Sequence, residues 1–245
     1  LNLTHGRFVQ LPVPVPTLKV QRRIVEILEA HLSRLDAAQR SLRVAASRQR
    51  AWRKAVLHHW IWDESFPLTT VAEVLREPMR NGRSDRASTD PQAVRTLTLT
   101  AVTKGEFVDK YTKPTSTARE MAAGLWLEPG DVLVQRSNTP ELVGTSARYD
   151  GPREWAIFPD LMIRLRADES RMDSRFLVAA LRSERAHGSL RKRAKGLAGS
   201  MPKIDQRAVG ETVVPIPPRH RQLEIAARLE ELDRAEDRLP EQLVQ

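Results

Sequence analysis

Three short stretches of the sequence carry side chains suited to contact with nucleic acid. They are Met79–Arg86 (MRNGRSDR), Gln135–Thr139 (QRSNT) and Arg191–Lys195 (RKRAK). Arginine pairs bidentately with guanine, and asparagine or glutamine with adenine, whereas lysine and arginine also bind phosphates regardless of sequence. We therefore expect base contacts from the first two stretches and phosphate contacts from the third. The predicted DNA-contacting residues are Arg80, Asn81, Arg83, Arg86, Lys104, Gln135, Arg136, Ser137, Asn138, Arg191, Lys192, Arg193, Lys195, Ser200 and Lys203.

Residues arranged for catalysis or metal binding are hard to find. Asp160 with Asp168-Glu169 is the nearest approach to a nuclease site, but an arginine stands where a lysine is needed. The glycine-rich stretch Gly196–Ser200 lacks the lysine that a phosphate-binding P-loop requires. His58 and His59 are adjacent, so on a helix they point about 100° apart. With no cysteine in the chain, thiolate zinc sites and iron–sulfur clusters are excluded. We expect a protein without catalytic residues, metal or cofactor.

The charge of the chain favours a polyanionic partner. Its 245 residues include 40 Lys and Arg against 31 Asp and Glu, which gives a formal net charge of +9. Such a balance indicates nucleic acid first and an anionic membrane second. No apolar run of about 18 residues exists to span a membrane, and no signal peptide opens the chain. The lack of cysteine agrees with the cytoplasmic location that we expect. Because the chain begins with Leu1, we expect a processed product or the carboxyl portion of a longer protein.

One sequence pattern occurs twice, with a constant offset of 201 positions between the matching residues. Val13–Pro16 is followed by Gln21, Ile24, Leu28 and Glu29, and Val214–Pro217 is followed by Gln222, Ile225, Leu229 and Glu230. Each copy predicts a short, proline-bounded strand that leads into a helix. The repeat therefore predicts two equivalent helices, one on each side of a single globular domain.

The two predicted helices have the features of an antiparallel coiled coil. The first runs from about Thr17 to Trp60, and at about 1.5 Å per residue it is roughly 65 Å long. The second, Arg219–Leu239, ends before Pro240. Basic residues dominate the first helix and acids slightly outnumber them in the second, and complementary charge of this kind sets partner and orientation in coiled coils. The predicted seam is Ile24, Leu28, Leu35, Leu42, Trp52 and Val56 with Ile225, Leu229 and Leu232.

The region between the helices predicts an α+β domain. Short segments rich in Val, Leu and Thr are separated by turn signals such as Asn81-Gly82. The predicted strands are Arg95–Ala101, Asp131–Arg136, Val143–Arg148 and Asp160–Arg166, and the predicted helix is Ser174–Arg193. A further strand is expected at Phe8–Val15, as the end of a preceding element. The resulting divisions are residues 1–16 (preceding element), 17–62 (first helix), 63–218 (globular domain) and 219–245 (second helix).

Two passages of the sequence resemble a known family. Leu127–Asn138 (LEPGDVLVQRSN) followed by Val143-Gly144 is similar to a strand and loop of target recognition domains. Gly199–Ile204, then Val214–Pro218 and Gln222, is similar to the passage that closes such a domain and begins its spacer helix. In order and spacing, and over nearly the whole chain, these passages resemble the specificity subunit of type I restriction–modification systems.

This resemblance implies a role in recognising double-stranded DNA. In the family, each of two target recognition domains binds one half of a bipartite site. Two antiparallel helices separate the domains and hold the methyltransferase subunits, and restriction subunits join through the complex. The specificity subunit itself catalyses nothing. A spacer of roughly 65 Å would span about two turns of duplex at about 34 Å each.

This chain departs from the full family pattern, which leaves several alternatives open. It has one recognition domain, and its second helix is less than half as long as the first. It is therefore expected to be either the carboxyl half of a full subunit or a half-subunit that forms a homodimer. Two other hypotheses are the recognition portion of a single-chain restriction and methyltransferase enzyme, and a coiled-coil adaptor without sequence specificity.

Overall fold

The computed structural model describes residues 5–10, 12, 14–196 and 201–242. The chain forms two units, residues 1–53 and 54–245. The first contains helix α1 (His5–Val9) and most of α2 (Leu18–Ile61), whose last two turns belong to the second. Among the described residues, no helix combines the length and apolar character needed to span a membrane.

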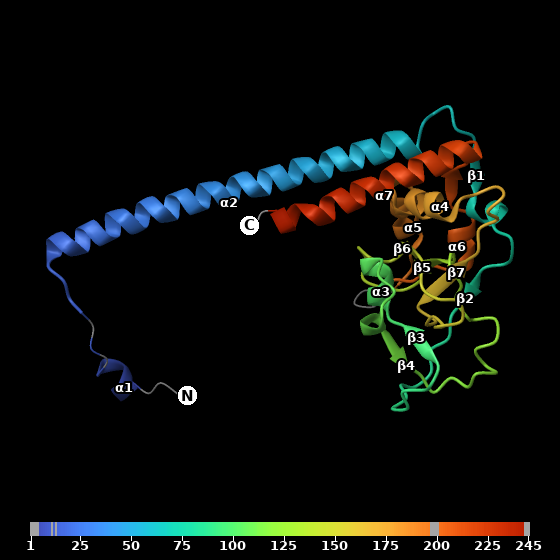
Figure 1. The fold of residues 1–245 in the computed structure, drawn as a ribbon, viewed down its shortest axis with the longest axis horizontal. Coiled ribbons are helices and arrows are strands. Elements are labelled where there is room, and N and C mark those ends of the chain that lie inside the picture. The colour runs from blue at the N-terminus through green and yellow to red at the C-terminus, as the bar shows by residue number, and fades with distance from the viewer. Residues whose placement is uncertain (1–4, 11, 13, 197–200, 243–245) are drawn as a thin grey trace. The chain divides into compact units, whose positions relative to one another are not determined.

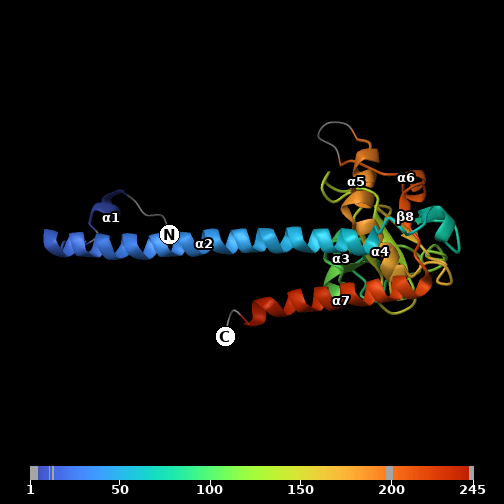
Figure 2. The same ribbon diagram turned by 90° about the horizontal axis from the view of Figure 1, so that it is seen from above.

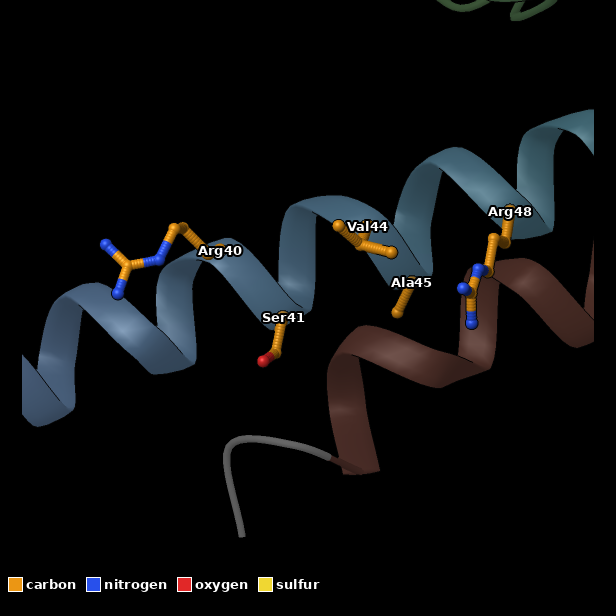
Figure 3. Close-up of a pocket in the computed structure, with 5 residues that line it drawn as sticks. All are labelled: Arg40, Ser41, Val44, Ala45 and Arg48. Carbon is orange, nitrogen blue, oxygen red and sulfur yellow. The ribbon is translucent and has the colours of Figure 1, made fainter.

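Helix α2 agrees with its predicted bounds to within one residue. It is rich in Ala, Leu and Arg, which are strong helix formers. The carbonyl of Thr17 accepts hydrogen bonds from the amides of Val20 and Gln21, so the helix begins directly after this residue. Figure 3 shows Ser41, Ala45 and Arg48 pointing to the same side of α2, as their spacing requires.

The predicted coiled-coil seam has different surroundings in the two helices. On α2, the side chains of Ile24, Leu28, Leu35, Leu42 and Trp52 are exposed. On α7 (Arg219–Gln242), Ile225 and Leu229 are buried in the core of the second unit. The pairing of the two helices as a coiled coil stays a prediction.

The second unit is built from short strands around a four-stranded antiparallel sheet of order β2-β7-β5-β6. Two further pairs, β1 with β8 and β3 with β4, are also antiparallel. The strands are β1 (Leu68–Thr70), β2 (Arg80–Asn81), β3 (Arg95–Leu97), β4 (Thr112–Pro114), β5 (Val132–Gln135), β6 (Ser146–Arg148), β7 (Met162–Leu165) and β8 (Val213–Pro215). The helices are α3 (Leu99–Lys104), α4 (Ser174–Arg182), α5 (Glu184–Arg193), α6 (Gln206–Gly210) and α7, with short 3-10 turns at Val71–Val74 and Asp109–Tyr111.

Helices cover both faces of the four-stranded sheet. Figure 1 shows α4 between the sheet and α7, with α3 on the other side of the sheet. Successive residues of a strand point to opposite faces, so Val132 and Val134 of β5 join the core under α4, while Leu133 joins the core under α3. This double burial explains the uninterrupted apolar run in β5.

Four expectations about the elements are wrong. Helix α1 (His5–Val9) includes the first two residues of the predicted strand Phe8–Val15, and the described residues of that segment form no strand. The segment Arg95–Ala101 is a strand only to Leu97 and then turns into α3. The helix Ser174–Arg193 is broken at Ser183, whose extended backbone begins α5 and whose hydroxyl accepts a hydrogen bond from Trp62 Nε1 at 2.9 Å. Helix α7 passes through Pro240 to Gln242.

The same glutamine-to-proline hydrogen bond occurs in each copy of the sequence repeat. Gln21 Nε2 donates to the carbonyl of Pro16 at 2.7 Å, and Gln222 Nε2 donates to that of Pro217 at 2.8 Å. In the second copy the glutamine is buried and does more: Nε2 also donates to Arg171 O, and Oε1 accepts from the amide of Asp173 at 2.7 Å. This side chain therefore ties α7 to the loop that precedes α4.

We expect Gln222→Ala to lower the free energy of unfolding by about 2–4 kcal/mol, because it leaves buried backbone groups without partners. The matched change Gln21→Ala should cost less than about 1 kcal/mol, since its single hydrogen bond is exposed. Urea unfolding of both variants measures the difference. Equal losses would contradict the role assigned to Gln222.

Candidate nucleic-acid interface

The register of the sheet brings two of the three predicted stretches to one edge. On β7, Ile163 lies opposite Asn81 of β2 on one side and Val134 of β5 on the other. Because both neighbours are antiparallel to β7, the carboxyl ends of β2 and β5 lie beside its amino end. The loops that follow Asn81 and Gln135 therefore leave the sheet at the same edge.

The loop after β2 lies close against the segment that precedes β7. Gly82 donates its amide to Met162 O, and a Cβ at this position would stand 2.2 Å from the carbonyl oxygens of Phe158 and Pro159. Only glycine allows this approach. Ser84 Oγ then donates to Asp160 Oδ1 at 2.5 Å. The Asn81-Gly82 turn signal in the sequence thus marks a close backbone contact.

The third predicted stretch joins this edge through a short two-stranded ladder. Lys195 and Lys203 exchange both backbone hydrogen bonds, at 2.9 and 2.8 Å, and Ile204 donates its amide to Arg136 O at 2.9 Å. Lys203 also forms an antiparallel bridge with Ser137. The loop after β5 and the basic segment after α5 are therefore neighbours.

Helices α5 and α6 add further basic side chains beside this edge of the sheet. They lie side by side, as Figure 2 shows. A shallow depression of about 480 Å³ between them is bordered by cationic side chains and by two carboxylates. Its lining includes Lys192, Arg193, Lys195, Arg207, Asp205 and Glu211. Basic side chains around a depression of this kind suit a phosphate backbone.

Ion pairs divide the cations of this surface into two groups. Arg83 Nε donates to Asp85 Oδ2 at 2.6 Å, and this bond, with one from Thr117, lowers the pKa of Asp85. Glu211 pairs with Arg207 and Arg193, and its contact with Arg207 lowers its pKa. Within the described part of the chain, by contrast, Lys192, Lys195 and Lys203 form no side-chain ion pair. These exposed lysines are thus available to an external phosphate.

The structure removes two residues from the predicted contact set. Gln135 is fully buried: its Nε2 donates to Leu99 O at 3.0 Å and to Thr103 Oγ1 at 2.8 Å. Ser137 is buried as well. Their prediction as base-contacting residues is wrong, because both side chains face the domain interior.

Two more of the predicted residues are hydrogen-bonded within the protein, in or beside the loop after β5. Asn138 Nδ2 donates to Gln135 Oε1 at 2.6 Å, and Arg191 Nε donates to Pro140 O at 2.9 Å. Arg136 is half-buried and makes one weak contact, at 3.4 Å, with Asp160 O. The guanidinium of Arg136 therefore remains largely available to an external partner.

The remaining predicted residues are placed as follows. Arg80, Asn81, Arg86 and Lys104 are exposed, and Asn81 Oδ1 accepts from Gln206 Nε2 at 3.0 Å. Lys104 ends α3, next to the residue that bonds Gln135. Ser200 lies outside the described residues.

Sequence reasoning gave no role at this edge to Asp160, which it considered only as a nuclease acid, and it missed Gln206 and Arg207. The helix α6 that carries Gln206 and Arg207 begins at Asp205, whose carboxylate accepts from the amide of Ala208. Aspartate before a helix is a recognisable N-cap signal, so this element was detectable. The partner of Asp160, in contrast, is Ser84, 76 residues away.

The acids considered for a nuclease site do not form one site. Asp160 precedes β7 and Asp168 follows it, so this four-residue strand, roughly 13 Å long, lies between them. Asp160 contacts Ser84, and Asp168 contacts Ser170.

Comparison with known proteins finds a similar sequence among restriction proteins. The chain is 24% identical over 257 residues to the type I restriction enzyme StySPI specificity subunit of Salmonella potsdam, with 99% of this chain and 55% of that protein covered. The chain is a homologue of type I restriction specificity subunits. This homologue spans about half the length of the relatives that it matches. No protein-family model matches it.

Solved structures show that the fold is that of specificity subunits. A chain from a study of complex assembly and conformational transition of the type I R-M system matches with a TM-score of 0.69 at 17% identity, covering 91% of this chain and 54% of that one. The HsdS subunit of Thermoanaerobacter tengcongensis matches at 0.57 with 19% identity, covering 91% and 53%. The S subunit of M. genitalium matches at 0.53 with 14% identity, covering 93% and 57%.

We expect Gly82→Ala to destabilise the specificity-subunit homologue by about 1–3 kcal/mol, because the added Cβ collides with two backbone carbonyls. Gly188→Ala in α5 is the matched control. A Cβ there meets nothing within 4 Å, so this change should stabilise the helix by about 0.5–1 kcal/mol. Urea unfolding gives both values, and a neutral Gly82→Ala would contradict the close approach.

Proposed function

We propose that this chain is a non-catalytic DNA-recognition subunit that binds one half of a bipartite duplex site within a type I restriction–modification complex. The observation that carries the proposal is the convergence of three basic or amide-rich segments at one edge of the sheet. They are distant in sequence, and the fold brings them to adjacent positions. The similarity to specificity subunits supports the same conclusion.

Base recognition and phosphate binding fall to different residues in this proposal. Arg136 would contact base edges in the major groove, where arginine pairs with guanine, assisted by the exposed Arg80 and Arg86. The exposed Lys192, Lys195 and Lys203 would contact phosphates. The ion pair of Arg83 with Asp85 assigns Arg83 a supporting role in shaping its loop.

The catalytic steps would belong to partner subunits. We propose that methyltransferase subunits dock on the helices α2 and α7 and that restriction subunits join through the complex. In this arrangement the chain contributes sequence recognition and spacing, with residues 17–62 and 219–245 as spacer and 63–218 as target recognition domain. An α2 of roughly 65 Å would separate two half-sites by about two turns of duplex.

We also propose that a second recognition domain packs on the first repeat. In the second repeat, Ile225 is 3% exposed and Leu229 9% exposed, because the domain covers them. Their counterparts Ile24 and Leu28 are 45% and 54% exposed. Gln21 repeats the bond of Gln222 to proline, but among the described residues its Oε1 accepts no hydrogen bond like the one that Gln222 accepts from the amide of Asp173. The second domain would come from a second copy of this chain or from sequence upstream of it.

Arg136→Ala should loosen base preference while leaving affinity for random duplex nearly unchanged, because it removes a contact to base edges. Lys192→Ala should weaken binding to all duplexes and reduce the salt slope of log K by about one, because it removes one phosphate contact. Fluorescence anisotropy on the duplex selected from a random library, and on random duplex, measures both effects. Equal losses on both duplexes for both variants would refute this division of roles.

The mass of the chain in solution decides where the second domain comes from. If a second copy supplies it, ultracentrifugation should give twice 27.8 kDa, and Ile24→Glu should return the monomer mass by charging the covered face. Arg22→Glu is the control, since residues two positions apart lie about 200° apart on a helix. A monomer for the unmodified chain would contradict the homodimer.

A further inference from the structure

Helix α5 holds the loop after β5 through three side chains on one face. His187 Nε2 lies 3.0 Å from Val143 O, and Arg191 Nε donates to Pro140 O at 2.9 Å. Leu190 packs against Gly144 between these two bonds. Residues three and four apart share a face of a helix, so the spacing 187, 190, 191 lets a single face contact the whole segment 140–144.

Gly144 allows this close approach. Its φ of +83° lies in the region that favours glycine, and an added Cβ would stand 3.0 Å from Leu190 Cβ. The Val143-Gly144 pair therefore has a physical role: the valine offers a carbonyl to α5, and the glycine makes room for it.

The hydrogen bonds within the loop after β5 do not use the carbonyls of Pro140 and Val143, which face α5. The amides of Leu142 and Val143 both donate to Thr139 O, and the amide of Gly144 donates to Gln135 O. The carbonyls of Pro140 and Val143 instead accept from α5. The helix thus supplies the contacts that fix this loop from outside.

In both contacts the donor that faces the loop is already used. A carbonyl can only accept, so His187 Nε2 must carry the proton and donate. Burial lowers the pKa of His187, which keeps the ring neutral at pH 7. The Nε–H of Arg191 is already engaged by Pro140.

The same helix leads directly into the phosphate-binding segment. Lys192 and Arg193 form its last turn, and Lys195 pairs with Lys203 beside Ser137. Binding of a phosphate by the basic segment would therefore act on α5, the helix that holds the loop carrying Arg136.

We propose that His187 and Arg191 are positioning residues, which hold the 136–143 loop in the conformation that presents Arg136 and so couple phosphate binding on α5 to base recognition. This inference rests on the proposed function of the interface. It moves Arg191 from the predicted phosphate contacts to the supports of the recognition loop.

Hydrogen exchange of the full chain without DNA tests the support directly. In His187→Ala and Arg191→Ala, amides of residues 136–144 should exchange about three- to tenfold faster, as expected for the loss of one hydrogen bond. His187→Gln and Arg191→Lys keep a donor and should restore most of the protection. Ser189→Ala, a change on α5 between these residues, is the control and should leave exchange unchanged. The melting temperature of each variant identifies any general loss of folding.

DNA binding then separates positioning from phosphate contact. For His187→Ala and Arg191→Ala, the ratio of affinity for the selected duplex to that for random duplex should fall about three- to tenfold, with an unchanged salt slope. Lys192→Ala should instead keep the ratio and lower the slope by about one.

The hydrogen-exchange and DNA-binding experiments distinguish a failure of this inference from a failure of the proposed function. Unchanged exchange at 136–144 in His187→Ala and Arg191→Ala would overturn the inference, as would an Arg191→Ala variant that loses equal affinity on both duplexes with a smaller salt slope. If the unmodified chain preferred no duplex, the proposed function would fail, and the exchange result would still decide whether α5 holds the loop.

Discussion

The position of β7 between β2 and β5 is the constraint on which the candidate interface depends. Ile163 pairs with Asn81 on one side and Val134 on the other, so the ends of both neighbours are fixed against one residue. A slip of one position would turn every side chain of a strand to the opposite face. Both faces of β5 are buried, so such a slip would place Leu133 and its neighbours in the wrong core. The register therefore fixes which loops meet.

A buried polar network holds the other end of β7 in place. Arg164 is 2% exposed and donates to Glu77 and to Trp126 O, while Arg166 donates to Asp131 Oδ1 at 2.7 Å. Buried charges are costly unless they are paired and hydrogen-bonded, and these arginines have both kinds of partner. They are thus part of the framework, whereas the exposed Lys192, Lys195 and Lys203 have no ion-pair partner in the described part of the chain.

The sequence was most informative where the pattern was long or strongly apolar. The period of α2 gave its bounds, and the apolar runs located β5 and β7. It failed where distant partners decide the outcome. The β-branched residues after Thr98 favour a strand locally, yet packing against β5 and β6 makes α3. The Val-Pro pattern formed a strand in its second copy because β1 pairs with it, and the described residues of the first copy have no such partner.

The candidate site was predicted in outline but not in its contacts. Composition alone located the three stretches, because arginine, lysine and amides stand out in short loops. It could not separate the buried Gln135 from the available Arg136, since that difference arises from Thr103 on α3. Likewise, only the tertiary contact of Arg191 with Pro140 distinguishes it from the adjacent Lys192.

Ultraviolet crosslinking of the chain to bound duplex, followed by mass spectrometry, tests the central claim most directly. If the three segments form one interface, crosslinked peptides should come from residues 79–86, 136–140 and 191–206 on the same duplex. Crosslinks confined to one segment, or centred on the β1–β8 pair, would contradict a shared DNA-binding edge.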